Sequence, residues 1–166
     1  MKKQNYRNLE GGQIDRENII SFTFNGQKLN GYEGDTLASA LIANGIHLTS
    51  RSFKYHRPRG IFSSGAEEPN AYLQISANNF EEPNVAAPLI EIFNGLDVKS
   101  SNCWPSVNFD LGAINNILSP IFIAGFYYKT FMHPRRMWPF YEKLIRKMAG
   151  VGTTPLESDS EKYEEY

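Results

Sequence analysis

The first clear pattern in the chain is an alternation of large apolar and polar residues that begins near residue 19. Ile20, Phe22 and Phe24 are separated by hydroxyl-bearing residues, and this period of two places the three apolar side chains on one face of a strand. Asn25-Gly26 follows, and both residues tolerate the positive φ of a type I′ turn. The pattern therefore predicts a hairpin whose return strand runs from Gln27 to Tyr32.

Directly after this hairpin the apolar spacing becomes helical. Asp35 stands where an N-cap would accept backbone N–H bonds, and Gly45 stands where a helix ends in the left-handed conformation. The residues between them place one apolar stripe on the helix, made of Leu37, Ala38, Leu41 and Ile42. We expect a single helix between Asp35 and Gly45.

Further strands are predicted before residue 100. One is expected at Ala71–Ile75, and a final pair is expected at Ala87–Phe93 and Leu96–Lys99, joined by a turn at Asn94-Gly95. Hairpin, helix and later strands in this order are typical of an α+β fold of the β-grasp type, here over residues 17–100. Residues 1–16 are polar and read as an arm that is ordered only against another surface.

The composition changes after residue 100. Residues 101–150 are rich in aromatic side chains and are interrupted by prolines, which predicts short helices and turns. Within this irregular helical, aromatic and proline-rich extension the best helix is expected at Trp138–Ala149. Residues 151–166 are acidic and polar and are predicted to be a linker.

The loop after the predicted helix resembles that of plant-type 2Fe-2S ferredoxins, but without their ligands. Ferredoxins hold the cluster with cysteines spaced C-x4-C-x2-C, since the irons need thiolates. When Phe62 is aligned with the aromatic residue that precedes the first cysteine of ferredoxin-like amine oxidase subunits, the ligand positions are occupied by Ser63, Glu68, Ala71 and, for the fourth, Pro88. Cys103 is the chain's single cysteine. We therefore expect a ferredoxin-like scaffold without its cluster and no metal site.

Several longer segments resemble the alpha subunit of heterotetrameric sarcosine oxidase. They are GGQIDR at 11–16, GDTLASALIANG at 34–45, RSFKYHRPRGI at 51–61, AEEPNA at 66–71, EPNV at 82–85 and LGAINNILSPIFIAGFYYKTFM at 111–132. The resemblance runs from about Leu9 to Tyr166. In that family a dinucleotide-binding domain and an aminomethyltransferase-like domain follow, so we expect this chain to be a fragment.

The resemblance implies a complex with beta, gamma and delta subunits that oxidises sarcosine. The products would be glycine, hydrogen peroxide and formaldehyde, or methylene-tetrahydrofolate when folate is present. FAD, FMN, NAD and tetrahydrofolate are implied for the full complex, but no cofactor and no catalytic residue are expected in this chain. It would act by packing against the remainder of alpha or against a partner subunit.

Two other functions remain open at this point. One is an electron-transfer ferredoxin-like subunit of an amine or opine oxidase, against which the residues at the four ligand positions argue. The other is a free-standing β-grasp module that binds a nucleotide through its basic loop.

The basic loop holds the main candidates for a cofactor or anion contact. Arg51, Arg57 and Arg59 are interleaved with aromatic residues, and guanidinium groups beside aromatic rings suit phosphates and planar rings. The competing interpretation pairs these cations with Glu67, Glu68, Glu81 and Glu82. Lys129, inside an apolar segment, either snorkels to water or meets an anion such as a flavin phosphate at a subunit interface.

Composition and charge argue against some functional classes of protein. The net charge of −1 and pI near 6.3 give no general attraction to nucleic acid. No apolar run is long enough to span a membrane. A single cysteine is compatible with a reducing cytoplasm, where we expect the protein. The three histidines are scattered without metal-ligand spacing, and we expect structural roles for them.

Overall fold

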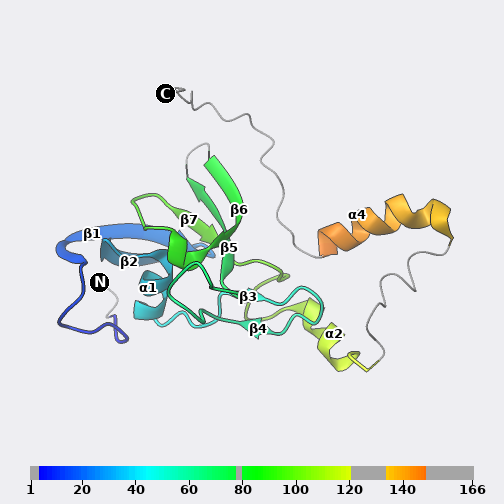
Figure 1. The fold of residues 1–166 in the computed structure, drawn as a ribbon, viewed down its shortest axis with the longest axis horizontal. Coiled ribbons are helices and arrows are strands. Elements are labelled where there is room, and N and C mark those ends of the chain that lie inside the picture. The colour runs from blue at the N-terminus through cyan, green and yellow to red at the C-terminus, as the bar shows by residue number, and fades with distance from the viewer. Residues whose placement is uncertain (1–3, 78–79, 121–133, 149–166) are drawn as a thin grey trace.

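The computed structural model describes residues 4–77, 80–120 and 134–148. A five-stranded sheet is its centre, in the order β2-β1-β7-β5-β6 (Figure 1). The elements are β1 (Asp15–Phe24), β2 (Gln27–Glu33), α1 (Leu37–Ala43), β3 (Ser50–Arg51), β4 (Pro58–Arg59), β5 (Tyr72–Ala77), β6 (Phe80–Ala86), η1 (Ala87–Leu89), β7 (Asp97–Lys99), η2 (Leu111–Ala113), α2 (Ile114–Ile117), η3 (Arg135–Met137) and α4 (Trp138–Met148).

The strand directions confirm the α+β, β-grasp prediction. β1 pairs antiparallel with β2 and parallel with β7, the last strand of the sheet, which also pairs antiparallel with β5. A hairpin, a crossing helix and a last strand inserted beside the first are the pattern expected from the element order. β3 and β4 form a separate two-stranded ribbon.

The first hairpin forms as predicted. Asn25 and Gly26 have φ values of 50° and 76°, so both central turn residues adopt the left-handed conformation. Phe22 pairs with Leu29 across the hairpin, and both are buried. β1 begins at Asp15, which places the last two residues of the predicted arm within the sheet.

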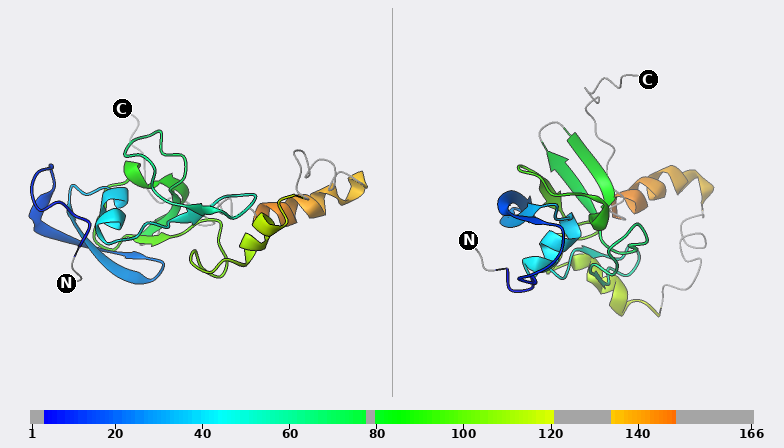
Figure 2. Two further views of the ribbon diagram at one scale, coloured as in Figure 1. Left: turned by 90° about the horizontal axis from the view of Figure 1, so that it is seen from below. Right: turned by 60° about the vertical axis from the view of Figure 1, so that its left-hand side comes forward.

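The core lies between α1 and one face of the sheet (Figure 2). Leu37 and Leu41 of α1 are fully buried with Phe22 of β1 and with Leu73 and Ile75 of β5. Polar residues alternate with these along β1 and β5, which is the pattern of a sheet with one buried face. Burial of this face holds the helix on the sheet.

The predicted N-cap of α1 is one residue too early. Thr36, and not Asp35, caps the helix: its hydroxyl oxygen accepts a hydrogen bond from the N–H of Ser39 at 3.2 Å. Asp35 is 1% exposed and bonds elsewhere. Both residue types suit an N-cap, so the local sequence does not distinguish them, and the tertiary partners of Asp35 decide the outcome.

The predicted final hairpin is wrong. Residues 87–89 form the short 3-10 helix η1, and the strand that precedes η1 is β6, which pairs with β5. β7 does follow the turn at Asn94-Gly95, but its neighbours are β1 and β5. The weak alternation of residues 87–93 reflects Pro88, Ile90 and Ile92, which pack inward from irregular backbone while Leu89, Glu91 and Phe93 are exposed.

Gly31 of β2 lies under the core with no room for a side chain. A Cβ there would lie 2.3 Å from Cδ1 of Ile92 and 3.3 Å from Cβ of Ala40. We expect Gly31→Ala to lower the free energy of unfolding by about 1–3 kcal/mol through overpacking, measured by urea unfolding. Ile92→Val removes the Cδ1 methyl group that would clash with the new Cβ. We therefore expect Ile92→Val to destabilise the Gly31→Ala variant less than it destabilises the wild type. Equal losses in both backgrounds would contradict this contact.

The extension continues from β7 through η2 and α2. The predicted helix near residue 138 is confirmed as α4, which Figure 1 draws away from the sheet. The predicted linker 151–166 and Lys129 lie outside the described residues. Across the described part of the chain, no helix is long and apolar enough to cross a membrane.

Candidate functional site

The loop that would hold a cluster is folded around the carboxylate of Glu68. Its Oε2 accepts hydrogen bonds from the N–H groups of Phe62 and Ser63 at 2.7 and 2.6 Å. Its Oε1 accepts from the N–H groups of Asn70 and Ala71 at 2.7 and 3.0 Å. Glu68 is 1% exposed. One buried carboxylate therefore organises both sides of the loop through charge-assisted hydrogen bonds.

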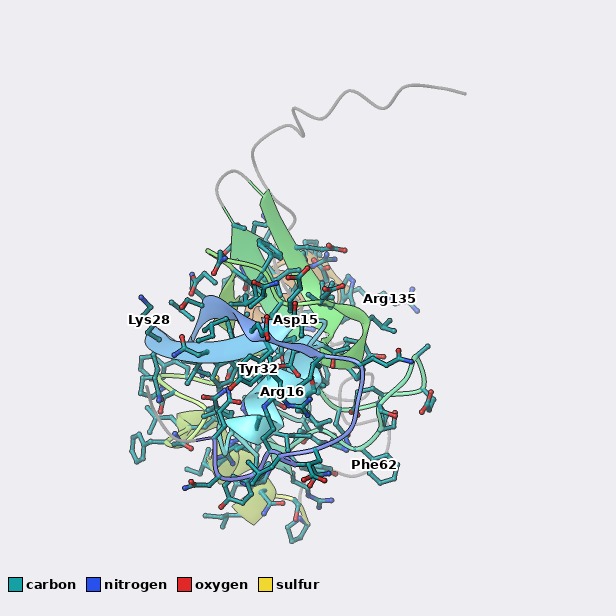
Figure 3. All side chains as sticks on the ribbon, turned by 90° about the vertical axis from the view of Figure 1, so that its left-hand side faces the viewer. Asp15, Arg16, Lys28, Tyr32, Phe62 and Arg135 are labelled. Atoms are coloured by element: carbon teal, nitrogen blue, oxygen red, sulfur yellow. The ribbon has the colours of Figure 1, made fainter. Side chains whose placement is uncertain are left out.

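The aligned ligand positions do lie together in space. Ser63, Glu68 and Ala71 meet through the Glu68 carboxylate, and Ala87, next to the buried Pro88, donates its N–H to the carbonyl of Ala71 at 2.9 Å. Figure 3 shows Phe62 at the periphery of the molecule, and its side chain is 78% exposed. Ser63, Glu68 and Ala71 thus lie in one loop, and η1, which contains Pro88, lies beside it.

These residues do not fit a 2Fe-2S cluster. A hydroxyl, a methyl and a proline ring offer no thiolate, and the one carboxylate already accepts four backbone N–H bonds. Cys103 lies in the extension, and burial, followed by the charge of Asp110, raises the pKa of its thiol. Among the described residues no group of three or more His, Cys, Asp or Glu could hold a metal ion.

The pKa of Glu68 lies below its ordinary value. Burial opposes ionisation and would raise this pKa, but the backbone N–H bonds from Ser63, Asn70, Phe62 and Ala71 outweigh it. The charge of Glu68 is therefore part of the fold at neutral pH. The sequence marked Glu68 as a missing ligand or as a partner of the basic-loop arginines, and its role as a backbone acceptor was not predicted.

The arginines of the basic loop contact neutral oxygens. Arg51 donates to the carbonyls of Val107 and His56, Arg57 to Oδ1 of Asn116, and Arg59 to Oδ1 of Asn70. The expected ion pairs of these three arginines with Glu67, Glu68, Glu81 and Glu82 are absent from the described residues. That interpretation of the arginines was wrong because Glu68 is committed to the backbone of its own loop.

Several of these bonds join the basic loop to the extension. His56 Nδ1 lies 2.7 Å from Oδ2 of Asp110, whose Oδ1 accepts from the N–H groups of Trp104 and Gly112. Asn115 also donates to the carbonyl of Lys54. Residues 51–59 and 104–116 therefore pack as one unit, and Asp110 of the extension is the hydrogen-bond partner of His56.

The N-terminal arm contacts the β-grasp unit itself. Arg7 forms a bidentate ion pair with the buried Asp35, with Nη1–Oδ1 and Nη2–Oδ2 distances of 2.9 and 2.5 Å, and lies over the ring of Tyr32. The ring of Tyr6 meets His47 edge-on at a centroid distance of 4.9 Å. Burial opposes ionisation of Asp35, but its bonds to Arg7, Tyr32 and Ser39 hold its pKa below the ordinary value.

Comparison with known proteins agrees with this geometry. Residues 17–103 match the family model described as a 2Fe-2S iron-sulfur cluster binding domain. The chain is 52% identical over 160 residues to the sarcosine oxidase subunit alpha of Rhizobium meliloti (strain 1021), covering 96% of this chain and 16% of that protein. It is 39% identical over 90 residues to that of Corynebacterium sp. (strain U-96), covering 52% and 9%.

The resemblance to sarcosine oxidase alpha subunits is thereby confirmed, and the chain spans about a sixth of the Rhizobium protein's length. A solved structure of L-proline dehydrogenase from P. horikoshii also matches, with 28% identity and a TM-score of 0.40 over 52% of this chain and 16% of that one.

Proposed function

The chain belongs to the family of 2Fe-2S iron-sulfur cluster binding domains, and we propose that this member is a structural, assembly domain of a sarcosine oxidase alpha subunit, without a cluster of its own. The observation that supports a structural role is the Glu68 carboxylate, which bonds to the loop where cluster ligands would stand. A domain without thiolate ligands has no means of carrying electrons through iron, which disfavours the electron-transfer alternative.

The surface proposed for assembly is the apolar patch of the extension. It comprises Trp104, Phe109, Leu111, Ile114 and Ile117, which are 50% to 77% exposed. These exposed apolar side chains come from one short stretch of the chain, residues 104–117, and exposed apolar surface of this kind marks a site of association. The remainder of alpha would cover this patch, or one of the beta, gamma and delta subunits would.

The assembled enzyme would then oxidise sarcosine to glycine with hydrogen peroxide and formaldehyde or methylene-tetrahydrofolate. FAD, FMN, NAD and tetrahydrofolate would be bound by other parts of this heterotetrameric flavoprotein complex, in the cytoplasm. In this proposal the chain supplies no group to the reaction, and it positions its neighbours by packing.

Co-expression tests the proposal. The tagged chain should co-purify with the rest of alpha and with the beta, gamma and delta subunits, and should contain no iron after anaerobic incubation with iron and sulfide. Ile114→Asp with Ile117→Asp should abolish co-purification, because each buries a charge at the interface. Leu9→Asp is the matched control, since Leu9 is 90% exposed and outside the patch. Stoichiometric iron, or undiminished capture of the double variant, would contradict the proposal.

A further inference from the structure

A polar pocket of about 310 Å³ lies between the β3–β4 ribbon and the adjoining ends of β5 and β6. Its wall contains the guanidinium-bearing residues Arg51 and Arg59, the aromatic residues Phe53 and Tyr72, and three asparagines. The volume is at the lower end of the range for small-molecule sites, roughly 300–1,000 Å³. The pocket is therefore large enough for a small ligand.

The charge of the pocket is positive. None of the described residues that line it is acidic. The hydrogen bonds of Arg51 and Arg59 go to two backbone carbonyls and one amide oxygen, so neither charge is neutralised by a carboxylate there. Asp110, whose charge acts on nearby Cys103, bonds to His56, Trp104 and Gly112. Two guanidinium-bearing residues in a lining that holds no carboxylate favour a dianion over a monoanion.

One wall residue has an unused acceptor. Oδ1 of Asn102 is buried and has no hydrogen-bond partner among the described residues. Buried polar atoms are nearly always bonded, so this acceptor lacks a donor that a ligand at the pocket wall could supply. Asn102 is held at this wall in the left-handed conformation, with φ of 55°.

The aromatic residues of the wall suit a planar group. Phe53 and Tyr72 line the pocket and are 43% and 40% exposed. A ring that stacks there would bring its own N–H donors into the site. From these features together we propose that the pocket binds a phosphate monoester, with the dianion on Arg51 and Arg59 and a donor of the attached group on Asn102.

Titration of the 166-residue chain tests this site. The probes are inorganic phosphate, adenosine 5′-monophosphate and adenosine, followed by NMR signals of the Arg Nε–H and Asn side-chain amides. We expect saturable shifts at Arg59 and Asn102 with both phosphates, tighter binding of the monophosphate, and no saturable binding of adenosine. If inorganic phosphate bound more tightly than adenosine monophosphate, the assignment of a monoester would be overturned. Saturable binding of adenosine would overturn the assignment of an anion site.

Two variants and one control locate the site. Arg59→Gln removes an exposed guanidinium of the wall, and Asn102→Asp places a carboxylate there in a residue type that tolerates positive φ. Each should weaken binding of adenosine monophosphate by about tenfold or more, because Arg59→Gln removes a charge-assisted bond and Asn102→Asp places a negative charge beside the bound dianion. Arg16→Gln makes the same charge change outside the pocket, where Arg16 bonds to the carbonyl of Gly11, and should leave affinity unchanged. If Arg16→Gln weakened binding of adenosine monophosphate as much as Arg59→Gln does, the effect would come from the net charge of the chain, and the proposal would be overturned.

Discussion

Replacing Glu68 with alanine should lower the free energy of unfolding by about 3 kcal/mol or more, because four backbone N–H groups lose their acceptor at once. Glu68→Gln keeps one acceptor oxygen but turns an amide donor toward N–H groups, so a smaller loss of the same sign is expected. Urea unfolding at constant salt measures both. Glu67→Gln is the control, since the neighbouring Glu67 is exposed and should leave the unfolding midpoint near that of the wild type.

The same position predicts a pH dependence. The pKa of Glu68 is lower in the folded chain than the roughly 4.3 of an unfolded glutamate, so its contribution is complete above that pH and is lost as the pH falls through the folded pKa. The stability difference between the wild type and Glu68→Gln should stay constant from about pH 7 to about pH 5 and shrink below about pH 4. A difference independent of pH down to acid unfolding would show that charge is not what Glu68 contributes.

Arg7→Ala is the second substitution expected to have a large effect. It leaves the Asp35 carboxylate, 1% exposed, with only Tyr32 and Ser39 as donors. Removing one partner of a buried ion pair lowers the free energy of unfolding by about 3–5 kcal/mol. We expect a loss near the lower end of this range, because Tyr32 and Ser39 still donate hydrogen bonds to the carboxylate. Denaturant unfolding would measure it, and hydrogen exchange should show the arm, residues 4–14, released.

A double-mutant cycle separates the ion pair from other effects. Asp35→Asn with Arg7→Ala should cost less than the sum of the single changes, since no uncompensated charge is left. Arg7→Lys should be intermediate because an ammonium cannot make the bidentate contact. Arg16→Ala removes a guanidinium at the start of β1, whose hydrogen bond to the Gly11 carbonyl is exposed, and should change stability by less than about 0.5 kcal/mol. If Arg7→Ala matched this control, the arm would have no stabilising role.

The hydrogen-bond networks around Asp35 and Glu68 show which features could not be predicted from the sequence. Asp35 and Thr36 are adjacent, both suit an N-cap, and only the presence of Arg7, 28 residues away, makes Asp35 the buried ion-pair partner and leaves Thr36 as the cap. Glu68 was weighed as a surface acid or as a lost ligand. Its function as a backbone acceptor depends on a loop conformation that brings N–H groups from residues 62, 63, 70 and 71 to one point.

The strands of the sheet also divide into those that local sequence predicts and those that depend on distant partners. The first hairpin was predictable because its turn residues and its alternation are local signals, and Asn25-Gly26 adopts the expected conformation. β7 has three residues and gains its partners from β1 and β5, which are far away in the chain. The weak alternation near residue 90 imitated a strand, since irregular backbone can also direct every second side chain into a core.

The sequence by itself determined the β-grasp class, the first hairpin and helix, and the lack of thiolate ligands, because each depends on short-range periodicity or on residue identity. Only the tertiary structure decided that Glu68 occupies the ligand loop, that Arg7 ties the arm to Asp35, and that Arg51 and Arg59 line a pocket with no acidic residue among its described lining. The physical reason is that charges are compensated by whichever groups the fold brings within hydrogen-bond distance, and sequence separation does not reveal that distance.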